Sequence, residues 1–196
     1  TAGENKGIDV WVGLGSNEEW WDDSTNQTWL NSESQANKNV IKEIWDSPVG
    51  YKNKSSFKGW YNSWEIDNDT FKAQADQLKL RGALKTIVDY AHSYTNLPIM
   101  TSPYVGGRST ALTPDGWKTM WTYLLDSANG ANFDVVAPQD NFGNVTTTYL
   151  AAMKQAVDTN PNCELWSNVE TYNPDVGCAE PTITMLNQLN TEIPYV

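Results

Sequence analysis

The chain has 196 residues, enough for one domain with a sizeable hydrophobic core or for part of a larger domain. Its formal net charge of −11 argues against nucleic acid and anionic membranes as partners, because phosphate groups are bound by clustered cations. No run of about 18 apolar residues occurs, so the sequence predicts no insertion into a membrane.

Strand-like and helix-like segments alternate along the chain. Strands are predicted where β-branched and aromatic residues gather, and helices where apolar residues recur at helical spacing. Asn68 or Asp69 is the expected N-cap of the second helix, and Gly82 leaves open whether that helix is one element or two. In chain order, the prediction is a strand at 8–15, a helix at 32–46, a strand at 57–66, a helix at 69–94, a strand at 97–105, a helix at 113–128, a strand at 133–140, a helix at 146–158, a strand at 163–172 and a helix at 181–193.

This alternation predicts an α/β fold with parallel strands and helices outside them, either an open doubly wound sheet or a closed barrel. The segment "GLGSNEEW" lacks the third glycine of a nucleotide-binding turn. Every predicted strand ends in polar or charged residues, as strands do at the mouth of a (β/α)8 TIM-type barrel. We therefore expect residues 1–196 to be one barrel domain, truncated at both ends. Its first and last strands are missing and would come from further chain segments or subunits.

Two glutamates end apolar strands beside aromatic residues. Glu65 ends the second predicted strand, and Glu170 ends the fifth. Glycoside hydrolysis needs two such carboxylates, about 5 Å apart for retention of configuration and about 6.5–9.5 Å apart for inversion. Trp64 would help to keep Glu65 protonated by excluding water. The sequence therefore predicts Glu65 and Glu170 as the catalytic pair.

Aromatic residues make up 12% of the chain, and ten of them are tryptophans. They form either a tryptophan-rich core or a platform for sugars, because the apolar face of a pyranose ring stacks on an aromatic ring. Polar side chains near the strand ends would bind the hydroxyl groups. The predicted substrate-binding residues are Trp20, Trp21, Trp64, Tyr104, Arg108, Gln139, Asp140, Trp166 and Tyr172.

Two further features favour an extracellular protein. Cys163 and Cys178 bracket one loop and are expected to form a disulfide, with two free thiols as the alternative. Four sequons without an internal proline predict glycosylation at Asn26, Asn53, Asn68 and Asn144. Two cysteines and one histidine do not have the spacing of a zinc site, so we expect no metal and no cofactor.

Four segments in order, "SSFKGWYNSWEID", "IMTSPYV", "FDVVAPQDNFG" and "ELWSNVETY", resemble a family of secreted glycoside-hydrolase-like (β/α)8-barrel proteins of unknown function. The resemblance covers about residues 8–195. It implies that Glu65, Gln139, Asp140 and Glu170 line the mouth of the barrel. Many retaining glycosidases with this fold place the acid/base after strand 4 and the nucleophile after strand 7, the same separation of three strands as between Glu65 and Glu170.

Two functions remain open at this point. The first is a secreted glycoside hydrolase acting on a poly- or oligosaccharide. The alternative is a non-catalytic extracellular protein, either a carbohydrate-binding module or a surface or structural glycoprotein. A Ser-His-Asp triad is not expected, because the single histidine, His92, lies on a predicted helix away from the strand ends.

Overall fold

The computed structural model describes residues 2–106, 109–139, 147–169, 171–173, 178–179 and 181–196, with backbone only at residues 172, 173 and 178. Strands alternate with helices through most of this range, as predicted. The strands are β1 (Val10–Gly13), β2 (Phe57–Asn62), β3 (Ile99–Thr101), β4 (Val135–Val136), β5 (Glu164–Leu165), β6 (Tyr172–Asn173) and β7 (Cys178–Ala179). The helices are α1 (Ala2–Lys6), α2 (Trp20–Asp23), α3 (Gln27–Trp45), the 3₁₀ helix η1 (Tyr51–Asn53), α4 (Gln74–Thr95), α5 (Pro114–Leu124), α6 (Thr147–Val157) and α7 (Thr182–Glu192).

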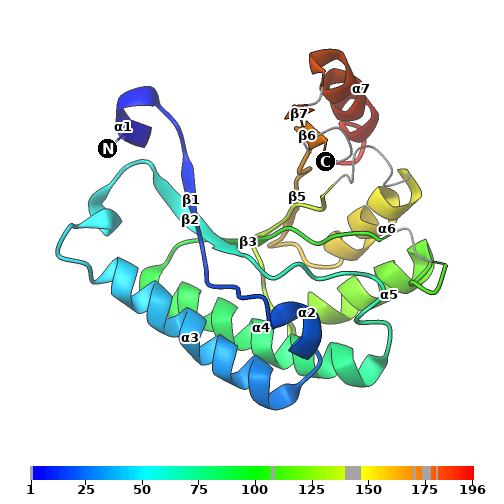
Figure 1. The fold of residues 1–196 in the computed structure, drawn as a ribbon, viewed down its shortest axis with the longest axis horizontal. Coiled ribbons are helices and arrows are strands. Elements are labelled where there is room, and N and C mark those ends of the chain that lie inside the picture. The colour runs from blue at the N-terminus through cyan, green and yellow to red at the C-terminus, as the bar shows by residue number, and fades with distance from the viewer. Residues whose placement is uncertain (1, 107–108, 140–146, 170, 174–177, 180) are drawn as a thin grey trace.

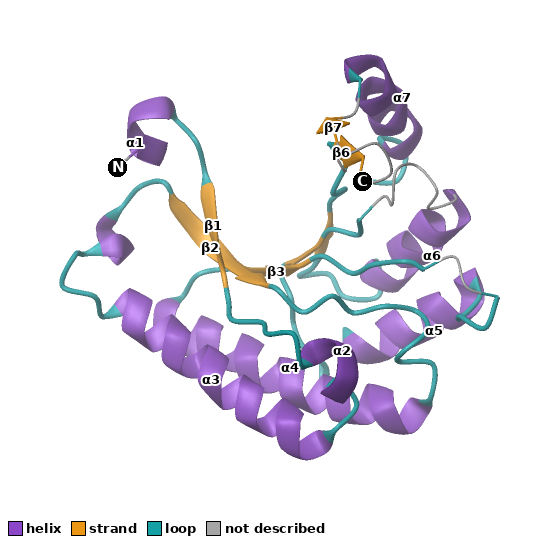
Figure 2. Cartoon of the chain, in the orientation of Figure 1, coloured by secondary structure: helices purple, strands orange, loops and turns teal. Residues whose placement is uncertain are grey.

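The main sheet has five parallel strands in the order β1-β2-β3-β4-β5, so each strand pairs with the next one along the chain. Figures 1 and 2 show a curved sheet with α3, α4, α5 and α6 on one side of it. The predicted α/β class and parallel sheet are therefore confirmed. The described strands form an open sheet with β1 and β5 at its edges, and they do not show a closed barrel.

The hydrophobic core lies between the sheet and these helices. Strand residues paired in register point to the same side of a sheet, and Trp60 of β2 is paired with Ile99 of β3. Both side chains are fully buried on the helix side, where Trp60 Nε1 donates a hydrogen bond to Thr95 Oγ1 of α4 at 3.0 Å. Val136 and Leu165 continue this apolar layer into β4 and β5.

The helix boundaries follow local capping chemistry. The Asn26 side chain accepts hydrogen bonds from the N–H groups of residues 28 and 29, so α3 begins at Gln27, five residues earlier than predicted. Helix α4 runs through Gly82 as one element. The expectation that Asn68 or Asp69 caps this helix is wrong, because its N-cap is Ala73.

Four aromatic side chains around α2 form a compact cluster in the core. Trp20 stacks on Trp64 with ring centroids 5.3 Å apart. Trp29 packs against both of these rings, and Phe71 packs against Trp20. Trp20 is 2% exposed and Trp64 is fully buried. The cluster therefore attaches the segment after β1 to the helix side of the sheet.

The opposite face of the sheet carries a contact between its two edges. Trp11 of β1 lies over Gly59 of β2, where an added Cβ atom would come within 2.4 Å of the Trp11 ring. Trp11 also meets Trp166, which follows β5, edge to face with ring centroids 5.7 Å apart. The curvature of the sheet thus brings side chains from its first and last strands together. Across the described residues, no helix is long and apolar enough to cross a membrane.

Candidate functional site

A cleft of about 550 Å³ opens where β2 and β3 end. The carboxyl ends of parallel strands are a common position for ligand sites, because the loops that follow them converge there. The loops after β1, β2 and β3 contribute the lining, which among the described residues includes Trp21, Glu65, Asp67, Asp69, Thr70, Tyr104 and Gly106. The cleft therefore combines carboxylates with aromatic rings.

Glu65 reaches the cleft because of the alternation of side chains along the extended chain. Trp64 points into the core on the helix side, so its neighbour Glu65 points to the other side. Trp20 Nε1 donates a hydrogen bond to the main-chain carbonyl of Glu65 at 3.3 Å, which fixes this backbone from within the core. Burial raises the pKa of Tyr61, and the charge of Glu65 raises the same pKa further, so the two side chains share one environment.

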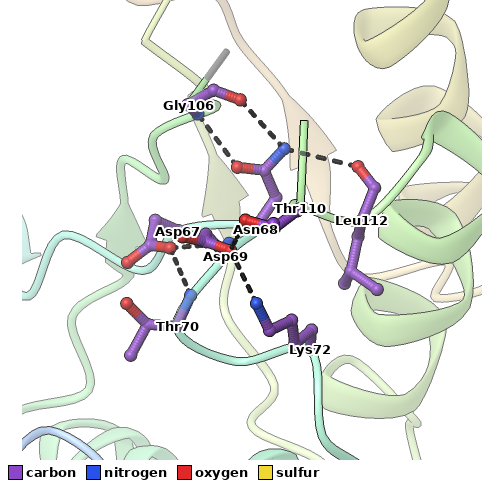
Figure 3. A network of polar contacts seen from close by, with 8 residues as sticks. All are labelled: Asp67, Asn68, Asp69, Thr70, Lys72, Gly106, Thr110 and Leu112. Carbon is purple, nitrogen blue, oxygen red and sulfur yellow. Dashed lines mark hydrogen bonds and ion pairs between the residues drawn. The ribbon is translucent and has the colours of Figure 1, made fainter. Parts of the chain in front are cut away.

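Asp67 and Asp69 occupy the cleft wall but already have partners of their own. Asp67 Oδ1 accepts hydrogen bonds from the N–H groups of Asp69 and Thr70, both at 2.7 Å. Asp69 Oδ1 accepts from Lys72 Nζ at 2.9 Å and from Thr110 Oγ1 at 3.0 Å, as Figure 3 shows. These two carboxylates order the loop, which leaves Glu65 as the stronger candidate for chemistry.

Asn68 joins the loop after β2 to the loop after β3. Its side chain is fully buried. Its Oδ1 accepts a hydrogen bond from Gly106 N at 2.9 Å, while its Nδ2 donates to the carbonyls of Gly106 and Leu112, both at 3.4 Å (Figure 3). The expectation of a glycan on Asn68 therefore does not fit the folded chain, because this amide is enclosed and fully hydrogen-bonded. Among the other sequons, Asn26 and Asn53 are exposed and Asn144 lies outside the described residues.

A second polar group lies at the ends of β3, β4 and β5. Asn168 Nδ2 donates to Ser102 Oγ at 2.8 Å, and that hydroxyl donates to the Ala137 carbonyl at 2.8 Å. Gln139 Nε2 donates to the Ser102 carbonyl at 3.2 Å. Gln139, which was predicted to bind substrate, is therefore positioned at the strand ends by a network that links three strands.

The structure brings together only some of the predicted site residues. Glu65, Trp21 and Tyr104 line the same cleft, and Trp21 is 65% exposed. Trp20 and Trp64 are core residues, because the sheet buries one side of this segment, and a sugar ring cannot reach them. Trp166 is 39% exposed, but it lies against Trp11 and donates a hydrogen bond to Glu164.

Several predicted positions cannot be compared with the cleft. Glu170, Arg108 and Asp140 lie outside the described residues, and so does the side chain of Tyr172. The pairing of Glu65 with Glu170 as two catalytic carboxylates therefore stays a prediction. Sequence reasoning did not select Ser102 and Asn168, although both are polar residues placed at strand ends, and this placement was the signal that selected Gln139.

The predicted disulfide is not found. Cys163 is a free, half-buried thiol directly before β5, whereas Cys178 begins β7, which pairs with β6 further along the chain. The side chain of Cys178 is outside the described part of the chain. Burial raises the pKa of Cys163 to about 12, so this thiol is neutral and unreactive at ordinary pH. Within the described residues, no group of three or more His, Cys, Asp or Glu side chains is arranged to hold a metal ion.

Together, the parallel sheet and the cleft define an α/β protein whose candidate site lies at the carboxyl ends of its strands. Residues 1–193 match the family model described as "Domain of unknown function (DUF4434)". The chain therefore belongs to this family, which confirms the resemblance to a domain family of unknown function. No curated protein matches the chain.

Proposed function

We propose that this protein is a secreted glycoside hydrolase that acts on a poly- or oligosaccharide in the cleft at the ends of β2 and β3. One observation carries the proposal: the Glu65 carboxylate, the exposed Trp21 ring and Tyr104 line a single cleft. A sugar has apolar ring faces and polar edges, so its recognition combines aromatic stacking with hydrogen bonds to hydroxyl groups.

Glu65 is proposed as the acid/base residue. In this role it protonates the oxygen of the leaving sugar and afterwards takes a proton from the attacking water. The proposed second carboxylate is Glu170, which acts as the nucleophile in this retaining mechanism. In the inverting alternative, Glu170 is the base that activates water and Glu65 serves only as the acid. The hydrogen bonds already made by Asp67 and Asp69 argue against these two residues as the partner.

The sheet is proposed to be an arc of a (β/α)8 barrel. Sequential parallel pairing and helices on the outer side support this arrangement (Figure 2). Further strand–helix units, from other chain segments or subunits, would pair with the β1 edge. An apolar groove of about 500 Å³ there, lined by side chains that include Val10, Val12 and Ile44, supports this position.

Reducing-sugar release from a panel of polysaccharides tests the hydrolase proposal. Glu65→Gln keeps the size of the side chain but cannot exchange a proton, so we expect a rate loss of about 10²-fold or more. Glu43→Gln, at an exposed position of α3, is the matched control and should retain the full rate.

Trp21→Ala should weaken polysaccharide binding, because it removes the exposed ring from the cleft. Binding without turnover in the unmutated protein would overturn the hydrolase proposal. It would favour the alternative, a non-catalytic extracellular carbohydrate-binding or surface glycoprotein.

A further inference from the structure

Two walls of the Glu65 cleft come from different loops. Glu65 and Asp67 lie on the loop after β2, and Tyr104 and Gly106 lie on the loop after β3. A ligand that contacts both loops fits only if they are held at the right separation, because small misplacements are costly in a binding site. The connection between the two loops therefore decides what the cleft can hold.

Asn68 makes this connection from inside the protein. Its buried side chain binds both the N–H and the C=O group of Gly106, and it also donates to the carbonyl of Leu112. The main-chain carbonyl of Asn68 accepts a further hydrogen bond from Leu112 N at 2.8 Å. One buried residue thus holds the loop after β3 at two points, as Figure 3 shows.

Other described connections between these loops differ from the Asn68 amide. Tyr104 N donates to the carbonyl of Ile66 at 2.9 Å, which is a contact between main-chain atoms only. Thr110 Oγ1 donates to Asp69 Oδ1, but Thr110 is exposed, so water can replace this hydrogen bond at little cost. Without the Asn68 amide, the N–H and C=O groups of the neighbouring loop gain most by turning toward water, and this motion displaces the cleft wall.

We propose that Asn68 is the positioning residue of this cleft, because its buried amide sets the place of Tyr104 and Gly106 relative to Glu65. The Asn68 side chain is fully enclosed, so it touches no ligand and acts through the residues that line the cleft. The consequence for sugars rests on the function proposed above. The hold on the loop after β3 does not.

Amide hydrogen exchange in the full chain tests this hold directly. Tyr104 N and Leu112 N are bonded to main-chain carbonyls, so Asn68→Ala removes neither of these two hydrogen bonds itself. Both amides should nevertheless exchange about tenfold faster or more relative to Trp60 N, which lies in the sheet, because the loop that carries them is no longer held.

Asn160→Ala is the matched control. Asn160 is also buried, and its Nδ2 donates to the carbonyl of Leu125, but it precedes β5 and so lies at the opposite end of the sheet from the cleft. This substitution should lower the stability of the protein without changing the exchange of Tyr104 N and Leu112 N relative to Trp60 N.

Hydrolysis gives the second measurement. Asn68→Ala should raise KM by about tenfold and lower kcat by less, because the displaced wall binds the sugar but takes no part in bond cleavage. Asn160→Ala should leave KM unchanged. Asn68→Asp keeps the size of the side chain and the acceptor for Gly106 N but loses the N–H donor. It is the second variant if Asn68→Ala fails to fold, and it should raise both KM and the loop exchange.

The proposal is overturned if exchange at Tyr104 and Leu112 only follows that of Trp60 in the Asn68 variants, since Asn68 would then act on global stability alone. It is also overturned if the loop loosens while KM stays unchanged. An unmutated protein that hydrolyses no polysaccharide would overturn the proposed function instead, and the exchange measurement would still decide the role of Asn68.

Discussion

Trp64 and Glu65 are neighbours in the sequence, yet they lie on opposite sides of the sheet. Trp64 is in the core against Trp20, and Glu65 lines the cleft. The alternation of an extended chain predicts that the two side chains separate. It does not predict which side is covered by helices, so Trp64 was assigned to the site as well.

Burial that local sequence does not reveal also explains why Trp20 and Asn68 were given the wrong roles. Trp20 belongs to an acidic loop with two adjacent tryptophans, and nothing in the sequence distinguishes the buried ring from the exposed ring of Trp21. Asn68 fits a sequon, but its burial depends on backbone groups of Gly106 and Leu112, about 40 residues further along the chain. Contacts of this kind cannot be read from local patterns.

His92 makes a contact that should give the stability of the protein a pH dependence. Its Nε2 atom lies 2.8 Å from Asp134 Oδ2, and the same oxygen accepts a hydrogen bond from Ile99 N at 2.7 Å. The hydrogen bond to Asp134 raises the pKa of His92 above its ordinary value of 6.5, and the charges of Asp134 and Asp89 act in the same direction. The nearby Cys163 thiol stays neutral.

Because the folded pKa is the higher one, the stabilisation is complete below pH 6.5 and is lost as the pH rises through the folded pKa. The free energy of unfolding in denaturant, measured from below pH 6.5 to above the folded pKa of His92, should fall in the unmutated chain. This fall should be absent in His92→Gln. NMR titration of the single histidine measures the pKa directly, and a value at or below 6.5 would contradict this assignment.

The extents of the elements were predicted better for helices than for strands. Each predicted helix is present, because apolar spacing and caps such as Thr113 before Pro114 are local signals. The strands are shorter than predicted, since polar loop residues follow the paired part of each one. Beyond those pairs, the isolated bridges Asp67–Tyr104 and Gln139–Asn168 are the only parallel contacts that extend the sheet among the described residues.

Substitution by alanine should change the stability of the protein in opposite directions at two glycines, Gly59 and Gly82. In β2, a Cβ atom on Gly59 would lie 2.4 Å from the Trp11 ring and 2.7 Å from the Pro98 carbonyl oxygen. We expect Gly59→Ala to destabilise the fold by about 1–3 kcal/mol, because backbone atoms would have to move. In α4, a Cβ atom on Gly82 meets nothing within 4 Å.

Gly82→Ala should stabilise the protein by about 0.5–1 kcal/mol, because alanine loses less backbone entropy in a helix than glycine. Denaturant unfolding of both variants measures the two changes. Equal effects, or an unaltered stability for Gly59→Ala, would show that Trp11 does not cover β2 as described.

For the whole molecule, the alternation of elements predicted the parallel sheet and its helical layer. Closure of the sheet could not be predicted from five strands, because it depends on pairing partners beyond them. The curvature also was not visible in the sequence. It becomes evident from Trp11 and Trp166, which lie far apart in the chain but meet across the open face.

The contact between Trp11 and Trp166 should couple the two edges of the sheet energetically. An edge-to-face pair contributes about 0.5–1.5 kcal/mol beyond its buried area. A double-mutant cycle with Trp11→Ala and Trp166→Ala should therefore give a coupling of this size in unfolding experiments. Additivity within about 0.3–0.5 kcal/mol would mean that the edges act independently.

The most direct test of the central claim is the initial rate of reducing-sugar release by the unmutated protein and by Glu65→Gln on the same polysaccharide. We expect release by the unmutated protein, a loss of about 10²-fold or more in Glu65→Gln, and the full rate in Glu43→Gln. An equal rate in Glu65→Gln would contradict the role given to the cleft between Trp21 and Tyr104.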